Sequence, residues 1–245
     1  MPDPCELSVV LPAYREADSL RMLLPKLVPL VNVASPRSEI IVSDSMEPLD
    51  DTEAVCAENG VVYIRRSGGN SYGDAVRSGI QRSRGRFVLL MDADGSHNPQ
   101  ITTELWRNRD KAEIIIGSRY VKGGATENPA ILILMSRVLN YAYQFAFRLP
   151  VSDVSNSLRL YRGDQLRSLH LVSNNFDIVE EILIRLVSGP AHATVLEVPM
   201  TFEQRKAGES KRNLPAFMLS YLSSMRKMQR FRREELAKQR SGRVE

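Results

Sequence analysis

Apolar runs alternate with segments of helical periodicity over the first hundred residues of this 245-residue chain. The runs are continuously apolar, which is typical of strands buried on both faces of a parallel sheet. The segments between them place apolar residues three and four positions apart, which predicts amphipathic helices. Strands are predicted at residues 7–14, 38–44, 61–66 and 86–94, and helices at 16–31, 51–60 and 68–85. This alternation predicts an α/β fold with a mostly parallel sheet and helices on both faces.

The elements continue less regularly beyond residue 100. Further strands are predicted at 112–120, 155–164 and 193–202, and further helices at 130–149, 176–189 and 214–240. A charged loop, 203–213, precedes the last helix. Since no repeat or flexible linker interrupts the chain, we expect one catalytic domain at 1–213 and a basic amphipathic extension at 214–245.

Charge is distributed unevenly along the chain. The formal net charge is +4, but residues 205–245 contain twelve Lys or Arg and four Glu, which leaves −4 for the rest. Such a segment is typical of a solvated helix face, or of a surface that meets phosphates or anionic lipid. Nucleic acid is not an expected partner, because no nucleic-acid-binding motif accompanies the basic residues.

The expected cellular compartment follows from the cysteines, the histidines and the length of the apolar runs. The two cysteines, Cys5 and Cys56, form no disulfide framework and, with three scattered histidines, no zinc-ligand spacing, so a reducing, cytosolic setting is expected. We see no signal-peptide pattern, and the longest uninterrupted apolar run, 129–135, is far shorter than the roughly 20 residues of a spanning helix. We therefore expect a chain that does not cross a bilayer by itself.

Two aspartates, Asp92 and Asp94, directly follow an apolar run in the stretch DADGSH. Carboxylates this close repel each other unless a cation lies between them. Because Mg²⁺ is held by one or two carboxylates plus substrate phosphates, the pair predicts a metal–nucleotide site. A D-x-D-G-[ST] sequence also opens phosphatases with an aspartate nucleophile, but there it lies on the first strand, whereas three strand–helix units precede it here. A dinucleotide-binding fold is disfavoured, because no G-x-G-x-x-G follows a strand.

Polar residues at other strand ends are expected at the same edge of the sheet. Asp44 closes the second strand, and Tyr14 and Glu16 follow the first. Ligands of open parallel sheets bind outside the carboxyl ends of the strands, which predicts that these residues line one site. Four cations suited to phosphate recognition point to a diphosphate near the same strand ends: Arg119, Arg159, Arg205 and Lys211.

Several motifs follow one another in order over residues 7–213. VVLPAYREADSL resembles V-x-P-x-[YF]-N-E, and YGDAVRSGIQRSRGRFVLLMDADGSHNP resembles G-x-A-x-x-x-G followed by D-A-D-x-S-H-x-P. IIIGSRYVKGG matches G-S-R-Y-x-x-G-G, SDVSNSLRLYR resembles D-x-T-S-G-F-R-x-Y-R, and VPMTFEQRKAGESK resembles V-P-I-x-F-x-x-R-x-x-G-x-S-K. Taken together, the set resembles the polyprenyl-phosphate sugar synthases of glycosyltransferase family 2, the group that contains dolichol-phosphate mannose synthase.

The resemblance implies a GT-A fold and an inverting, metal-dependent transfer of a mannose- or glucose-type hexose from a nucleoside diphosphate sugar to a polyprenyl phosphate. It implies that Asp94, helped by Asp92, holds Mg²⁺ or Mn²⁺ against the donor diphosphate, with a GDP-sugar favoured over a UDP-sugar. Arg119 is implied as a catalytic residue that faces the acceptor phosphate, and Ser136 and Arg159 as acceptor-binding residues. The implied donor-binding residues are Pro12, Tyr14, Glu16, Asp44, Ala93, Arg205 and Lys211.

The chemistry of such a transfer needs no strong general base, because a lipid phosphate is already ionised at neutral pH. Catalysis then consists of aligning the acceptor oxygen and stabilising the leaving diphosphate. We therefore expect His97, in the DADGSH stretch, to support the structure rather than to take part in the chemistry.

Three positions depart from the family pattern. Ser43 replaces one of two paired aspartates, Ser157 replaces a glycine, and Leu132 stands where an arginine is usual. These changes leave the nucleobase open and weaken the expectation of a polyprenyl phosphate in particular. The alternatives are a small soluble or peptide-linked acceptor, and a nucleotide-sugar-binding protein without turnover.

The apolar helix 130–149 and the basic helix 214–240 bear on where the protein acts. As a pair they are able to lie at a membrane surface, with the apolar face in lipid and the cations toward headgroups. The alternative is that they pack on each other or across a dimer. We expect a cytoplasmic protein, peripheral on the cytoplasmic membrane face, with a homo-oligomer or a membrane partner subunit as further options.

Overall fold

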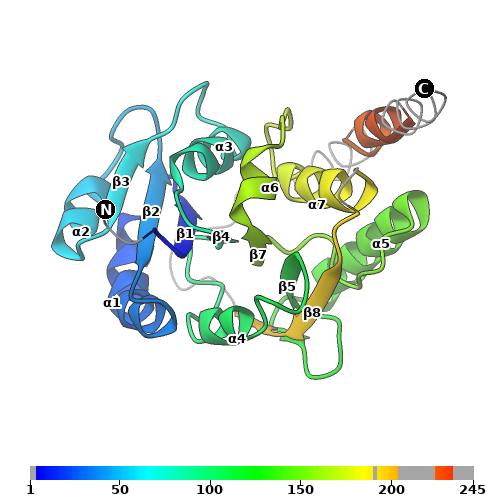
Figure 1. Ribbon diagram of the computed structural model, residues 1–245, viewed down its shortest axis with the longest axis horizontal. Coiled ribbons are helices and arrows are strands. Elements are labelled where there is room, and N and C mark those ends of the chain that lie inside the picture. Colours follow the sequence, from blue (N-terminus) through cyan, green and yellow to red (C-terminus); the bar gives the residue numbers. More distant parts are fainter. Residues whose placement is uncertain (1–3, 190–191, 204–223, 234–245) are drawn as a thin grey trace.

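The computed structural model describes residues 4–189, 192–203 and 224–233 (Figure 1). Its centre is a seven-stranded sheet in the order β3-β2-β1-β4-β7-β5-β8. The strands are β1 (Leu7–Pro12), β2 (Ser38–Asp44), β3 (Val62–Arg65), β4 (Phe87–Leu90), β5 (Ile114–Ser118), β7 (Arg159–Arg162) and β8 (Val195–Pro199). Neighbours are parallel except at β7, which is antiparallel to β4 and β5. The mostly parallel sheet predicted from the sequence is therefore confirmed.

Helices cover both faces of this sheet, as predicted (Figure 1). One face carries α1 (Ala17–Ala34), α2 (Thr52–Glu58) and α4 (Ile101–Arg107). The other carries α3 (Tyr72–Arg82), α5 (Ala130–Phe147), α6 (Gly163–Arg167) and α7 (Ile178–Ser188). Residues 224–233 are also helical, and Met228 buries this segment against the second group. Two short strands, β6 (Ala125–Thr126) and β9 (Thr201–Phe202), pair beside the main sheet.

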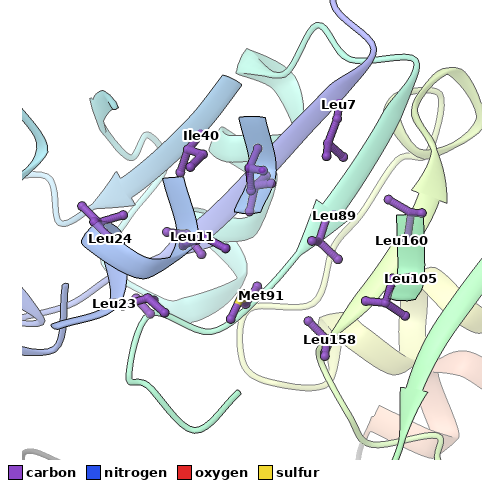
Figure 2. Close-up of a cluster of buried hydrophobic side chains, with 14 of the residues drawn as sticks. Leu7, Leu11, Leu23, Leu24, Ile40, Leu89, Met91, Leu105, Leu158 and Leu160 are labelled. Atoms are coloured by element: carbon purple, nitrogen blue, oxygen red, sulfur yellow. The ribbon is translucent and has the colours of Figure 1, made fainter. Parts of the chain in front are cut away.

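Successive residues of the central strands point into two separate hydrophobic cores. On β1, Leu11 joins the core under α1, α2 and α4, whereas its neighbour Val10 joins the core on the opposite face. Figure 2 shows the first core, which includes Leu24 of α1, Leu89 of β4 and Leu105 of α4. Each such side chain contributes roughly 1.5–3 kcal/mol when it is fully buried. Burial on both faces explains why the strands are continuously apolar.

Helix α3 packs closely against β1 at Gly79. A Cβ added at Gly79 would stand 2.2 Å from Cγ1 of Val10 on β1. The helix begins with a capping box, in which the Ser71 hydroxyl accepts from the Asp74 backbone N–H and the Asp74 carboxylate accepts from the Ser71 backbone N–H. The glycine-bearing motif therefore fixes the first turn of α3, including Tyr72, against the strand ends.

Some elements differ from the sequence prediction. The short helices α4 and α6 and the two-residue strands were not predicted, because segments this short carry little periodicity. The strand predicted at 155–164 is confined to β7, and the one predicted at 193–202 divides at Met200 into β8 and β9. Of the predicted helix 214–240, the described part, 224–233, is helical, and the rest lies outside the described residues.

Candidate active site

The carboxyl ends of β1, β2 and β4 meet at one edge of the sheet. Pro12 of β1 is in register with Ser43 of β2, and Val10 of β1 with Leu90 of β4. The predicted convergence of strand-end residues is therefore confirmed. The residues that leave the sheet together at this edge are Tyr14, Asp44, Asp92, Ala93 and Asp94.

Two hydroxyl groups hold the carboxylate of Asp92. The Tyr72 hydroxyl donates to Oδ1 at 2.8 Å, and the Ser157 hydroxyl donates to Oδ2 at 2.7 Å. Tyr72 is itself fixed by stacking on Phe176, with ring centroids 4.3 Å apart. Burial, together with the neighbouring Asp92 carboxylate, raises the pKa of Tyr72 well above its ordinary value, so the phenol stays protonated as a donor. The orientation of Asp92 is thus set before any ligand arrives.

Asp94 lies in a tight turn next to Asp92. Its Oδ1 accepts hydrogen bonds from the Ser96 backbone N–H at 3.0 Å and from the Ser96 hydroxyl at 2.6 Å. Gly95 between them has a φ of +74°, a conformation that glycine adopts without strain. The turn is joined to the end of β9, because the Glu203 backbone N–H donates to the Ser96 carbonyl at 2.9 Å.

His97 is fully buried beneath the aspartate pair and joins two loops. Its Nδ1 accepts from the Asp92 backbone N–H at 3.4 Å, and its Nε2 lies 3.2 Å from Oδ1 of Asn156. The ring also meets Phe202 edge-on at 5.5 Å between centroids. These contacts agree with the expectation that His97 supports the structure.

Arg66, which the sequence analysis did not identify, ties the strand ends together. Its guanidinium donates to backbone carbonyls of Asp44 at 2.8 Å, of Ser71 at 2.8 Å, and of Ala13. Burial lowers the pKa of Arg66, although nearby carboxylates act in the opposite direction. Tyr14 is half-exposed, and its ring centroid lies 5.8 Å from the Arg66 guanidinium. A buried arginine after a strand has no distinguishing sequence signal, because its partners are backbone atoms.

Asp44 is buried at the end of β2, and one of its oxygens is unsatisfied. The Tyr63 hydroxyl lies 3.3 Å from Oδ2, whereas Oδ1 has no hydrogen-bond partner among the described residues. Burial raises the pKa of Asp44. An unpaired buried oxygen is costly, so a donor group from a ligand or water would stabilise this position.

Residues 43–54, which begin with the departing Ser43, connect β2 to α2 and also contact α1. Asp50 satisfies the first backbone N–H of two helices, because its Oδ2 accepts from the Ala17 backbone N–H at 3.0 Å and its Oδ1 accepts from the Thr52 backbone N–H at 3.1 Å. Glu16 precedes α1 and accepts from the Ser19 hydroxyl at 2.7 Å. Asp50 thus anchors the first residues of α1 and α2 beside the site.

On the opposite side of the site, Arg119 is held by a buried carboxylate. Its Nε and Nη2 donate to the two oxygens of Asp153 at 2.8 and 2.6 Å, in a bidentate pair. The same Nη2 lies 2.9 Å from the Ser155 hydroxyl and 3.4 Å from the Ser136 hydroxyl. The structure therefore brings together Arg119 and Ser136, which the resemblance assigned to the acceptor.

Arg159 corrects the prediction of an acceptor-binding residue. Its side chain is fully buried in β7, and its guanidinium donates to the backbone carbonyls of Val179, at 2.8 Å, and Val154. These contacts join the sheet to α7 and leave the guanidinium inaccessible to a phosphate. Arg205 and Lys211, the predicted donor-phosphate cations, lie outside the described residues.

A cavity of about 510 Å³ lies next to the site, between α1 and the turn after β4. Gly95, His97 and Pro99 form one wall, and Met22 and Lys26 of α1 form the other. Neither Asp92 nor Asp94 lines it, so this hollow adjoins the carboxylate pair without containing it. We place the candidate chemistry at the carboxylates, where the strand ends converge.

Residues 8–169 match the model of glycosyl transferase family 2. The chain belongs to this family. It is 32% identical to the polyprenol monophosphomannose synthase of Mycolicibacterium smegmatis over 83% of this chain and 79% of that protein. It is 31% identical to the undecaprenyl-phosphate mannosyltransferase of Micrococcus luteus over 82% of this chain and 85% of that protein. A dolichol-phosphate mannosyltransferase of Pyrococcus furiosus is 30% identical over 84% of this chain but 59% of its own length.

Solved structures show the same fold. Glucosyl-3-phosphoglycerate synthase from Mycobacterium tuberculosis, in complex with Mn²⁺, UDP and phosphoglyceric acid, superimposes with a TM-score of 0.74 at 18% identity, over 92% of this chain and 78% of that chain. The same enzyme with Mg²⁺ and UDP gives a TM-score of 0.68 at 18% identity, over 90% of this chain and 79% of that chain. The fold of this family 2 glycosyltransferase is therefore of the GT-A type, as the resemblance implied.

The donor set of this glycosyltransferase suits a hard divalent cation. Among residues 4–189, 192–203 and 224–233, no group of three or more His, Cys, Asp or Glu side chains gathers into a metal cluster. A cation at this edge of the sheet would take carboxylate oxygens from Asp92 and Asp94, and its remaining ligands from a diphosphate and water. This division is usual for Mg²⁺ and for Mn²⁺ bound with nucleotides.

Proposed function

We propose that this glycosyltransferase moves a mannose- or glucose-type hexose from a nucleoside diphosphate sugar to a polyprenyl phosphate, with inversion and with Mg²⁺ or Mn²⁺. The observation that carries the proposal is the preoriented pair of Asp92 and Asp94 at the carboxyl end of β4. Its support is the similarity, at 31–32% identity over most of the chain, to proteins named as synthases or transferases of polyprenyl-phosphate mannose.

The donor half of the proposed reaction lies at the ends of β1, β2 and β4. Asp94, with Asp92, would hold the cation, which supplies charge neutralisation for the leaving diphosphate. The half-exposed Tyr14 and the unpaired Oδ1 of Asp44 are suited to the base and ribose, and a GDP-sugar is favoured over a UDP-sugar. Further residues proposed to line the donor are Pro12, Glu16 and Ala93, with Arg205 and Lys211 from outside the described residues.

The acceptor half is proposed to centre on Arg119 and Ser136. Asp153 fixes the guanidinium of Arg119 in position, so that Arg119 would meet the acceptor without a change of rotamer. A phosphate monoester already carries the nucleophilic oxygen in its ionised form, and no side chain is required to remove a proton. The rate then depends on alignment and on the charge of the site.

A thermal-shift panel tests the donor half. GDP-, UDP- and dTDP-sugars are each added with and without Mn²⁺, and a ligand that binds only the folded state raises the melting temperature by mass action. The expected result is a shift for GDP-sugars that requires Mn²⁺ and is absent in Asp94→Asn. Equal shifts with and without metal would contradict the proposed role of the carboxylate pair.

Two alternatives give different results. Transfer to a small soluble or peptide-linked acceptor predicts donor binding, but no product in the lipid phase when polyprenyl phosphate is offered. A nucleotide-sugar-binding protein without turnover predicts a metal-dependent shift with neither transfer nor donor hydrolysis. A fixed Asp92 favours binding of a metal–diphosphate with or without turnover, so donor hydrolysis or transfer by the wild type, lost in Asp94→Ala, separates this alternative from the proposed enzyme.

A further inference from the structure

The ring of Tyr72, whose hydroxyl holds Asp92, is fixed from outside its own helix. Tyr72 is the first residue of α3, and its ring stacks on that of Phe176, with centroids 4.3 Å apart and an angle of 24° between the planes. Phe176 belongs to the loop 172–177, which leads into α7. The direction of the Tyr72 hydroxyl, and with it the hydrogen bond of 2.8 Å to Oδ1 of Asp92, therefore depends on where this loop lies.

The loop 172–177 also contacts the first turns of α3 through its backbone. The Gly73 backbone N–H donates to the Asn174 carbonyl at 2.7 Å, and a Cβ added at Gly73 would stand 2.2 Å from the Ser173 carbonyl oxygen. Arg77, one turn further along α3, donates to the Ser173 carbonyl and, at 2.9 Å, to Oδ1 of Asn174. The loop and the start of the helix are thus one packed unit, in which a shift of the loop moves the start of the helix.

Two carboxylates of α7 and its N-cap hold the loop from the other side. Glu181, which is fully buried, accepts from the backbone N–H of Val172 at 3.1 Å and from that of Ser173 at 2.8 Å. Asp177 accepts from the Asn175 backbone N–H at 3.0 Å through its Oδ1. Hydrogen bonds to ionised acceptors are stronger than those between neutral groups, so these bonds fix the path of the loop.

The helix at residues 224–233 contacts the first of these anchors directly. The Ser224 hydroxyl donates to Oδ2 of Asp177, and Met228, one turn later, is buried in the core that includes residues of α7. Figure 1 shows this helix, in orange-red, on the side of the domain that carries α5 and α7. Asp177 directly follows Phe176, so the helix holds the residue next to the stacked ring.

A second route from the same helix runs through Arg185 of α7. Its Nε donates to Oε1 of Glu181 at 2.7 Å, and the Phe231 ring covers its guanidinium, 3.8 Å from the ring centroid. A guanidinium over an aromatic ring is attracted to it, most strongly where water is excluded. The Arg185 side chain is 12% exposed and that of Glu181 is fully buried, so Phe231 lies at the edge of a mostly buried network.

We propose that Phe176 is a positioning residue for the carboxylate of Asp92, and that the helix 224–233 holds the loop that carries it. The affinity for a divalent cation together with a nucleoside diphosphate then depends on a helix about 130 residues away in sequence. The physical reason is that the Tyr72 hydroxyl bonds well to Asp92 only within a narrow range of distance and angle, and a ring without its stacking partner leaves that range. This inference rests on the metal-binding role of Asp92 in the proposed function, and not on the acceptor.

Phe176→Ala tests the positioning role. We expect the Kd for Mn²⁺, measured by calorimetric titration in the presence of GDP, to rise about tenfold, at the lower end of the range for partners of metal ligands. Phe176→Tyr keeps the aromatic stack and should restore wild-type affinity. Saturating Mn²⁺ should also restore the binding of GDP to Phe176→Ala, because the defect lies in the affinity for the cation.

A second background separates positioning from a general loosening of the fold. In Tyr72→Phe the hydroxyl that acts on Asp92 is absent, so Phe176→Ala has nothing left to position. We expect Phe176→Ala to raise the Kd for Mn²⁺ by less than about twofold in this background, whereas independent effects would multiply. A general loosening would weaken binding alike in both backgrounds, so the comparison holds even when Phe176→Ala lowers the melting temperature.

The contribution of the helix 224–233 is tested by Ser224→Ala combined with Phe231→Ala. These changes remove its contacts with Asp177 and with the Arg185 guanidinium. We expect the Kd for Mn²⁺ to rise about fivefold, which is at the lower end of the usual coupling between separate sites. The effect should again be suppressed in the Tyr72→Phe background.

The matched control is Lys227→Ala combined with Gln229→Ala, at two exposed positions of the same helix. Alanine preserves the helix there, so this variant should bind Mn²⁺ as wild type does. Unchanged Mn²⁺ binding in Phe176→Ala would overturn the inference, as would an effect of equal size in the wild-type and Tyr72→Phe backgrounds. Equal binding by the Ser224 and Phe231 variant and the control would overturn the role of the helix.

Failure of the proposed function gives a different pattern. Wild-type protein that binds Mn²⁺ with GDP but forms no lipid-phase product would contradict the proposed transfer and leave the positioning of Asp92 intact. Wild-type protein that transfers hexose, with the same Mn²⁺ affinity as Phe176→Ala, would contradict the positioning alone. Wild-type protein that binds no Mn²⁺ in the presence of GDP would contradict both.

Discussion

The hydroxyl of Ser157 donates to Oδ2 of Asp92 at 2.7 Å, across 65 positions of sequence. The related motif T-S-G-F-R has glycine at this position, so the chain has gained a hydroxyl where the family pattern has none. Together with the Tyr72 hydroxyl, it fixes both oxygens of a carboxylate that is proposed to bind the metal–donor complex. Groups that orient a metal ligand in this way commonly set metal affinity.

Removing the Ser157 hydroxyl should weaken metal binding. In Ser157→Ala we expect the Kd for Mn²⁺, measured by titration in the presence of GDP, to rise about tenfold, within the range of 10–100-fold for partners of metal ligands. Ser157→Gly removes the same hydroxyl and also makes the backbone more flexible, so a comparison with Ser157→Ala separates the two effects. Equal effects in both variants identify the hydroxyl as the cause, whereas an effect of glycine alone would show that the hydrogen bond to Asp92 is unimportant.

Tyr72→Phe tests the other oxygen of Asp92. The ring keeps its stacking on Phe176, and only the hydrogen bond to Oδ1 is lost. We expect a similar rise in the Kd for Mn²⁺, and in the double variant with Ser157→Ala a change that differs from the sum of the two, because both hydroxyls act on one carboxylate. Unchanged metal binding in Tyr72→Phe would mean that Asp92 is positioned by its backbone alone.

Breaking the buried pair of Arg119 and Asp153 should cost stability. Asp153 is fully buried and the Arg119 side chain is 8% exposed, so Asp153→Ala removes a buried, bidentate carboxylate partner of the guanidinium. We expect the free energy of unfolding in urea to fall by about 3–5 kcal/mol. Asp18→Ala breaks an exposed pair with Arg21 and should change the free energy of unfolding by less than about 1 kcal/mol. Equal effects of the two variants would rule out a special role of burial.

The close approach of α3 to β1 makes a prediction about packing. Gly79→Ala places a methyl group where Val10 now lies, and should lower the free energy of unfolding by about 1–3 kcal/mol. Val10→Ala alone leaves a cavity and is also destabilising. If the added methyl group collides with Val10, the double variant should lose less unfolding free energy than the two single variants lose together, by about 0.5 kcal/mol or more. Strict additivity would show that the helix moves away instead.

Glu39 gives a pH dependence whose sign is determined by its partners. Burial alone would raise the pKa of Glu39, but hydrogen bonds from Ser8 and Arg84 outweigh it and hold the pKa below the ordinary value of 4.5. The ionised group therefore stabilises the fold above about pH 4.5, and this contribution is lost as the pH falls through the lowered pKa. Unfolding free energies of Glu39→Gln should depend less steeply on pH in this acidic range. Glu53→Gln, at a side chain 59% exposed, is the control for the loss of a surface carboxylate.

Much of the fold follows from local sequence patterns. Strands β1, β2 and β4 are short apolar runs between amphipathic segments, and this pattern alone predicts a parallel sheet with helices on both faces. The antiparallel insertion of β7 between β4 and β5 does not follow, because strand order depends on long-range contacts that no local pattern encodes. The seven-residue helix α4 is too short to show a helical period.

The residues of the candidate site could be predicted where reactive side chains directly follow an apolar strand. Asp92 and Asp94 stand directly after an apolar run, and their placement follows from the rule that ligands bind at the carboxyl ends of parallel strands. Arg159 was predicted wrongly because its partners are backbone carbonyls that only the folded chain brings near it. The Ser157 and Tyr72 hydroxyls were missed for the same reason, since nothing local connects them to Asp92.

The most direct test of the proposed function is transfer of labelled hexose from a GDP-sugar to a polyprenyl phosphate, compared between wild type and Asp94→Asn. The amide keeps the size of the side chain and its turn with Ser96 but removes the negative charge. We predict lipid-phase product that requires Mg²⁺ or Mn²⁺, is abolished by a chelator, and falls about a hundredfold or more in the variant. Product formed at the same rate by Asp94→Asn, or in the presence of the chelator, would contradict metal-dependent transfer at this carboxylate pair.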